Sequence, residues 1–122
     1  LLIIMNSEDK EIIVLNFLNH CGLNCANMNM LNTIQIPRDL LLDINKYNEI
    51  QEHISLLKSV FSSSQLTSLQ SNASNNQRWP LLNLVRQILR FSGYKLVPKR
   101  LCDGYTKEGK KKYKRFFLIE KM

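Results

Sequence analysis

The apolar positions in the middle of the chain recur with the period of a helix. Four of them are three or four residues apart and therefore share one helical face: Ile50, Ile54, Leu57 and Phe61. This spacing predicts a helix over about residues 46–61. Three serines at 62–64 end it and can cap a shorter helix over about 65–70, and the polar stretch 71–77 predicts a connecting loop.

The best-marked helix is predicted at Pro80, because the first turn of a helix tolerates a residue without an N–H group. The apolar side chains that follow form one stripe: Leu81, Leu82, Val85, Ile88 and Leu89. Gly93 lies where a helix-ending glycine is expected. This helix therefore has one face for the core and a second, polar face that can meet a partner.

Two apolar and aromatic arms with turn residues between them predict a β-hairpin after this helix. The first arm covers 94–101 and the second 112–119, and Gly104 and Gly109 lie between them. Pro98 lacks a backbone N–H, which confines the first arm to a sheet edge or a bulge.

The N-terminal part of the chain is less regular. Acidic residues at 8–11, followed by an apolar run that stops before Gly22, predict a helix, although so short a run also fits a buried strand. We interpret Leu1–Ile4, which precede Met5, as an upstream extension or a truncation scar.

The asparagine-rich stretch 19–33 has no regular period and predicts a loop, with Met28 and Met30 packed against the core. Residues 33–36 alternate between β-branched and polar side chains, and Pro37 closes them. This pattern predicts a small edge strand.

These elements predict an α+β fold, a small helical domain that ends in a β-hairpin in the order of a winged helix-turn-helix. At 122 residues we expect one compact domain, with a helix and loop segment carrying the short strand at 1–37 and a winged-helix-like basic domain at 38–122. The order assigns the recognition helix to 83–90 and the wing to 105–115.

The positive charge of the chain is concentrated near its C-terminal end. The formal net charge is +7, yet residues 1–77 carry four basic and seven acidic side chains, whereas residues 78–122 carry thirteen basic and three acidic ones. The two parts therefore have net charges of −3 and +10. This asymmetry predicts a polyanionic partner for the last third, and by itself it does not distinguish DNA, RNA and anionic lipid.

The polar face of the helix after Pro80 carries side chains that can hydrogen-bond to base edges. They stand at positions i, i+3, i+4 and i+7: Asn83, Arg86, Gln87 and Arg90. Arginine can pair with guanine, and asparagine or glutamine with adenine, through two hydrogen bonds. The stripe contains no carboxylate, which favours groove recognition over the alternatives of a solvated face or a protein interface.

The hairpin turn is the most basic part of the sequence. Six cations cluster around it, with aromatic residues between them: Lys107, Lys110, Lys111, Lys112, Lys114 and Arg115. A wing of this composition can lie along phosphates, although lysines on an exposed strand also protect against aggregation. Tyr105 and Tyr113 can stack on bases, so binding to single strands stays an alternative.

No motif indicates catalysis or a cofactor. HExxH, P-loop, GxGxxG and GxSxG patterns are absent, and no catalytic carboxylate pair suggests itself. A zinc site would need His20, Cys21 and Cys25 to be completed by Cys102 or His53, so we interpret the first two cysteines as buried and reduced. The longest apolar run is five residues, against roughly 20 for a membrane span, so no membrane is expected as a partner. No small-molecule substrate is expected either.

The stretch QRWPLLNLVRQILRFSGYKLVPKR and the later DGYTKEGKKKYKRFFLIEK resemble a module of uncharacterised proteins from large cytoplasmic DNA viruses of the mimivirus kind. The resemblance implies a viral source and a basic module, but no substrate. Asparagine at 13 of 122 positions also suits an AT-rich genome.

The sequence predicts a non-catalytic, intracellular protein that binds nucleic acid, with duplex DNA favoured, in the host cytoplasm, the nucleus or the virion. The alternatives are a protein-interaction or virion structural module and an RNA or single-strand binder.

Overall fold

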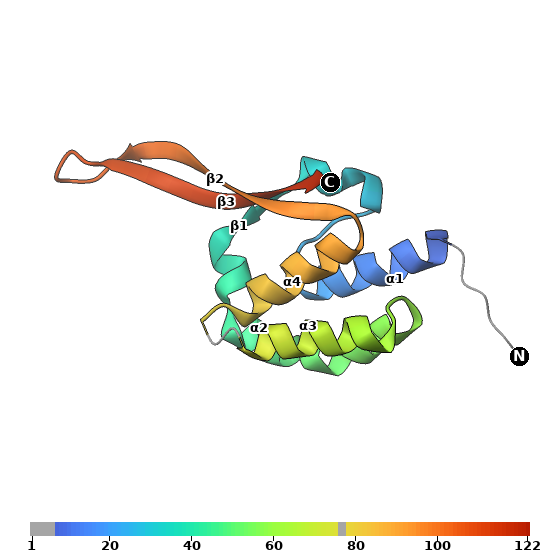
Figure 1. The fold of residues 1–122 in the computed structure, drawn as a ribbon. Helices are drawn as coiled ribbons and strands as arrows, with labels where there is room; N and C mark the ends of the chain where they lie inside the picture. Colours follow the sequence, from blue (N-terminus) through green and yellow to red (C-terminus); the bar gives the residue numbers. More distant parts are fainter. Residues whose placement is uncertain (1–6, 76–77) are drawn as a thin grey trace, which may run out of the picture.

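The structure, a computed structural model, describes residues 7–75 and 78–122 and combines helices with a three-stranded antiparallel sheet. The helices form the body, and the sheet lies along one side of them and extends well past them (Figure 1). The α+β class is therefore confirmed. The interpretation of Leu1–Ile4 concerns residues outside the described part of the chain.

The first helix, α1 (Ser7–His20), shows that the helical alternative for this segment is correct. Its end is a glycine turn in which the Gly22 amide donates to the Asn19 carbonyl and the Leu23 amide to the Leu18 carbonyl. Gly22 has φ +103°, a left-handed conformation that a residue with a side chain rarely adopts. The glycine therefore ends α1 as expected.

The stretch predicted as a loop over 19–33 contains a 3₁₀ helix, η1 (Met28–Thr33). With three residues per turn, Met28 and Leu31 share its inner side and are buried. Met30 lies on the other side and is 45% exposed, so its predicted packing is wrong.

The predicted edge strand is β1 (Gln35–Pro37), shifted two residues from the expected start. It pairs with the last strand of the chain, so that Ile36 lies opposite Phe117. The 3₁₀ helix η2 (Arg38–Leu42) follows at once.

The long helix predicted over 46–61 begins earlier and changes type. It consists of α2 (Ile44–Ile50) and the 3₁₀ helix η3 (Gln51–Ser59). Asp43 caps α2, because its carboxylate accepts hydrogen bonds from the backbone of the next turn. The predicted apolar face is confirmed, since all its members are buried: Ile50, Ile54, Leu57 and Phe61.

The next helix, α3 (Ser63–Asn75), is longer than the predicted 65–70. The stretch 71–77 contains neither glycine nor proline to stop it, so the predicted connection is helical through Asn75. Leu69 is buried and Leu66 half-buried.

The best-marked helix is α4 (Pro80–Phe91), and its predicted start and end are confirmed. Its buried side is formed by Pro80, Leu81, Leu84, Val85, Ile88 and Leu89. Leu82, which the stripe included, is only half-buried, because Leu84 takes the inward position instead. Gly93 has φ +89° and turns the chain into the hairpin.

The predicted hairpin is formed by β2 (Tyr94–Tyr105) and β3 (Lys111–Lys121). The strand order is β1-β3-β2, so the expected two strands gain a third beside β3. β2 is an edge strand, which accommodates Pro98 as predicted.

A single cluster of buried apolar residues runs from Val14 in α1 to Ile119 in β3. Leu96, Phe117 and Ile119 anchor the base of the hairpin in this core. All residues from 98 to 115 are exposed, and in Figure 1 this part of β2 and β3 projects away from the helices. We call residues 98–115 the arm.

Candidate functional site

The predicted recognition residues of α4 lie on the side that the core leaves uncovered. Arg90 is exposed, and Asn83, Arg86 and Gln87 are half-buried. Asn83 and Gln87 already interact with other groups of the chain, so they would have to exchange those interactions for a ligand. The two arginines are therefore the more available members of the set.

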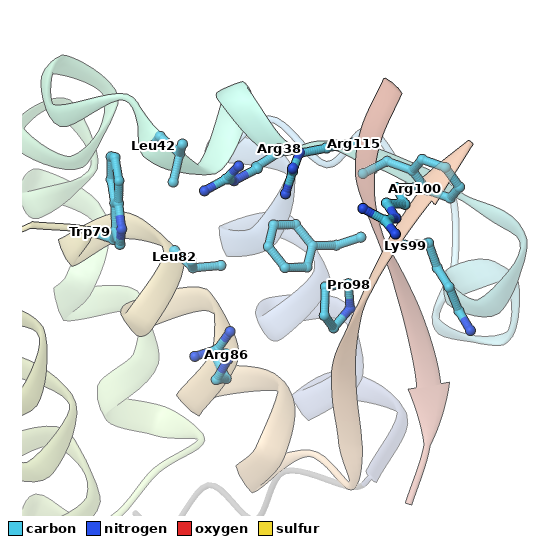
Figure 2. A pocket seen from close by; sticks show the side chains of 11 residues that line it. Arg38, Leu42, Trp79, Leu82, Arg86, Pro98, Lys99, Arg100 and Arg115 are labelled. Atoms are coloured by element: carbon cyan, nitrogen blue, oxygen red, sulfur yellow. The ribbon is translucent and has the colours of Figure 1, made fainter. Parts of the chain in front are cut away.

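Arg86 lies at the edge of this polar face and lines a pocket of about 460 Å³ between α4, η2 and the hairpin. In Figure 2, Arg38 enters the pocket from η2 and Arg86 approaches from α4, with the hairpin closing the remaining side. The pocket thus joins the helix face to the start of the arm.

Five cationic side chains line this pocket. They are Arg38, Arg86, Lys99, Arg100 and Arg115. The sequence pointed to only two of them, Arg86 and Arg115. Arg38 lies in the acidic part of the chain and reaches the pocket through the pairing of β1 with β3, for which the sequence carried no signal. Lys99 and Arg100 precede the predicted turn, in the predicted first strand of the hairpin.

No carboxylate of the described residues lines the pocket. Two ion pairs of the described residues, Lys46–Glu49 at 3.3 Å and Lys95–Glu120 at 3.9 Å, both lie outside the pocket. The positive charge around the pocket is therefore not neutralised by neighbouring acids of the described chain. Cations that repel one another in this way form a favourable environment for an anion.

The remaining lining of the pocket is largely apolar. It consists of Leu42, Trp79, Leu82, Pro98, Phe116 and Phe117. Phe116 and Phe117 are 6% and 5% exposed, so they supply a rigid floor, whereas Trp79 and Leu82 are half-buried and form one wall. The pocket therefore combines charge with a surface that organic groups can contact.

The cations of the arm do not form one surface. Successive residues of a strand point to opposite faces, so Lys112 and Lys114 face away from Arg115. Arg115 lies opposite Arg100 in the register, and the Arg100 guanidinium is 4.6 Å from the centre of the Tyr113 ring. One face of the arm thus continues the pocket, and the other carries lysines of its own.

The turn of the arm carries the other predicted cations, Lys107 and Lys110, and Lys111 begins β3. All three are exposed. Two apolar or aromatic side chains of β2 are also open to solvent, since Leu101 is 57% exposed and Tyr105 is 67% exposed. The arm is therefore a two-stranded ribbon with charge on both faces and no core beneath it.

The histidines and cysteines weighed as a zinc site are divided between different places. The His20 and His53 rings stack, with centroids 4.1 Å apart, and Cys102 lies on the arm. Within the described residues, no three His, Cys, Asp or Glu side chains are arranged to hold a metal ion. Cys21 and Cys25 are buried, as predicted. Burial raises the pKa of the Cys21 thiol to about 12, which keeps it neutral.

No family model, curated protein or solved structure matches this chain. The described helices also include none with the length and apolar character required to cross a membrane.

Proposed function

We propose that this protein binds duplex nucleic acid, DNA in preference to RNA, and catalyses no reaction. The observation that carries the proposal is the group of cations on α4, around the pocket and on the arm, none of which forms an ion pair with a carboxylate of the described residues. Electrostatic attraction to phosphates supplies most of the affinity of such surfaces, and side chains on a helix supply the specificity.

The order of elements supports a winged helix-turn-helix. A helix and a short strand precede further helices, α4 follows them, and a hairpin ends the chain, with β1 added beside β3. In this arrangement α4 takes the part of the recognition helix and the arm takes the part of the wing.

We assign different roles to α4 and the arm because their side chains differ. Arg86 and Arg90 carry guanidinium groups, which can donate two hydrogen bonds each to guanine, while the lysines at the tip of the arm neutralise phosphates without reading sequence. The preference for DNA rests on groove shape, because the major groove of B-form DNA admits a helix and that of A-form RNA is too deep and narrow. The resemblance of the last third to proteins of large DNA viruses agrees with a role on a viral genome inside the infected cell.

Anisotropy titrations of labelled duplex DNA, single-stranded DNA and duplex RNA at several salt concentrations test this proposal. We expect duplex DNA to bind tightest, with log affinity falling against log salt at a slope of about −3 to −5, for three to six phosphate contacts. A protein-interaction module would bind none of the three polymers. Tightest binding to single strands would instead favour stacking on the exposed Tyr105 and Tyr113.

Base reading requires a separate experiment. A preferred site is first selected from a randomised duplex library, and Arg86→Ala with Arg90→Ala is then compared on that site and on random DNA. We expect the double variant to lose about tenfold or more affinity for the selected site beyond its loss on random DNA. The matched control is Lys10→Ala with Lys58→Ala, which removes the same charge from other surfaces. Equal losses on both duplexes would leave only a phosphate-binding surface.

A further inference from the structure

The pocket between α4, η2 and the hairpin differs from the rest of the basic surface because it is concave. Its volume of about 460 Å³ lies within the range of about 300–1,000 Å³ that is usual for small-molecule sites. The tip lysines, by contrast, are fully open to solvent. A flat phosphate backbone needs no concavity of this kind.

The cations of the pocket come from four elements, since Lys99 and Arg100 belong to β2. Arg38 belongs to η2, Arg86 to α4 and Arg115 to β3; Figure 2 draws Arg38 and Arg115 close together and Arg86 apart from them on the α4 side of the pocket. Guanidinium groups bind phosphate oxygens through two parallel hydrogen bonds, so arginines that converge from several directions can hold one phosphate group. Because the described lining residues include no carboxylate, these donors have no acidic partner within the pocket lining.

The apolar wall of the pocket indicates a second property of the ligand, in addition to its phosphate group. Trp79, just before α4, and Leu82 on α4 present apolar surface in the same pocket as the arginines, with Phe116 of β3 in the floor. A phosphate in the middle of a duplex would use the arginines and leave this wall unused, because the bases there are stacked inside the helix. A nucleotide whose base is unstacked would use both, since aromatic side chains and arginine planes bind the face of a base.

We infer that this pocket binds one nucleoside phosphate unit, with its phosphate held by the arginines and its base against the wall formed by Trp79 and Leu82. The inference goes beyond the proposed function, because it requires no duplex. The unit can come from a free nucleotide or from the unpaired end of a strand, and both present the same phosphate and base.

Trp79 is the single tryptophan of the chain, so its fluorescence reports directly on this pocket. We expect adenosine 5′-monophosphate to quench it saturably, inorganic phosphate to compete weakly, and adenosine alone to have little effect. A 5′-phosphorylated dinucleotide that binds more tightly than the mononucleotide identifies a strand end as the source, and equal affinities identify the free nucleotide. No saturable change with either phosphorylated probe would overturn the inference.

The variant Arg38→Ala tests the site while leaving in place Arg86 and Arg90, proposed to read bases, and the lysines of the arm, proposed to neutralise phosphates. We expect it to weaken binding of the monophosphate about tenfold or more, since each charge-assisted hydrogen bond contributes at that level. Lys58→Ala is the matched control, because this exposed lysine lies on η3 outside the pocket. Circular dichroism of both variants checks that the fold is retained, and a folded Arg38→Ala protein with unchanged affinity contradicts the inference.

The experiments can contradict the proposed duplex binding and the pocket inference independently of each other. If duplex DNA binds while the monophosphate gives no signal, the pocket inference is wrong and the proposed function stands. If the monophosphate binds and no polymer does, the proposed function is wrong and the pocket is a site for free nucleotides. If inorganic phosphate competes as well as the monophosphate, the apolar wall has no part in binding and the nucleoside assignment is overturned.

Discussion

Ile36 of β1 lies directly opposite Phe117 of β3, and both side chains are buried in the core. This contact attaches the N-terminal part of the chain to the base of the hairpin. Arg38 follows β1 after Pro37 and therefore reaches the pocket that Arg86 and Arg115 also line. The pairing thus connects a position of the acidic part of the chain to the basic surface.

Substituting Ile36 by alanine should lower the free energy of unfolding by about 2–4 kcal/mol, because a fully buried side chain leaves a cavity. Urea denaturation followed by circular dichroism measures the loss. The neighbouring Gln35→Ala, on the exposed side of β1, should change stability by less than about 0.5 kcal/mol. Equal midpoints for the two variants would mean that β1 contributes little to the core.

The start of α3 should depend on a reciprocal cap. The Gln65 amide donates to Ser62 Oγ at 3.2 Å, and the Ser62 amide donates to Gln65 Oε1 at 2.9 Å. Ser62→Ala should therefore cost about 1 kcal/mol of stability, and Ser62→Asp should restore most of it. Ser71→Ala, at an exposed position within α3, serves as the control and should have no such cost. Thermal unfolding of the three variants distinguishes the cap from a general effect of losing a hydroxyl.

The arm should be dispensable for folding and required for binding polyanions. Residues 101–114 can be replaced by Asn-Gly, because Arg100 and Arg115 lie opposite each other and a two-residue turn can join such a pair. We expect the shortened protein to unfold cooperatively within about 1 kcal/mol of the parent, since a ribbon without a core adds little stability. Its salt slope on duplex DNA should be clearly shallower. An unfolded product would show that the arm contributes to the core.

The charge of the tip can be tested without changing the length of the arm. Replacing Lys110, Lys111 and Lys112 by glutamine should make the salt slope about 3 units less steep, at roughly 0.9 per lost phosphate contact. The matched control replaces three lysines in the acidic part of the chain, Lys10, Lys46 and Lys58. If both triple variants shift the slope equally, net charge rather than the tip governs binding.

The three thiols should differ in reactivity. Cys102 is exposed, whereas Cys21 is buried and its pKa is raised from 9.0 to about 12 by desolvation, with Lys46 opposing the shift. At pH 8 we expect iodoacetamide to modify Cys102 and to spare Cys21 until the protein unfolds, as peptide mass spectrometry can record. Rapid modification of Cys21 in the folded protein would contradict its burial.

The same pKa shift has a consequence at alkaline pH. Between about pH 9 and 12 the unfolded chain has lost the Cys21 proton and the folded protein still holds it, so the free energy of unfolding falls as the pH rises. Below pH 9 this thiol contributes no pH dependence. Cys21→Ala should remove this part of the alkaline slope, which urea denaturation at several pH values measures against the parent protein.

The errors in the predicted elements have a common physical origin. The period of 3.6 residues located the buried face over Ile50 to Phe61, but it did not show that η3 is a 3₁₀ helix, because apolar positions three apart fit both geometries. The stripe predicted to be buried in α4 included Leu82, whereas the structure buries Leu84 and leaves Leu82 half-buried, for a related reason. Which leucine of α4 is buried depends on the neighbours it packs against, and these come from other parts of the chain.

Some features of the candidate site also follow from local sequence patterns, whereas others depend on contacts between distant segments. The sequence by itself determined α4, its polar face and the lysine-rich hairpin, because helix periodicity, proline and glycine act between near neighbours in the chain. Only the tertiary structure decided that Arg38 joins Arg86 and Arg115 around an apolar pocket, and that the arm carries its cations on two faces. Those features depend on strand pairing and register between distant segments, which the core selects and no local pattern encodes.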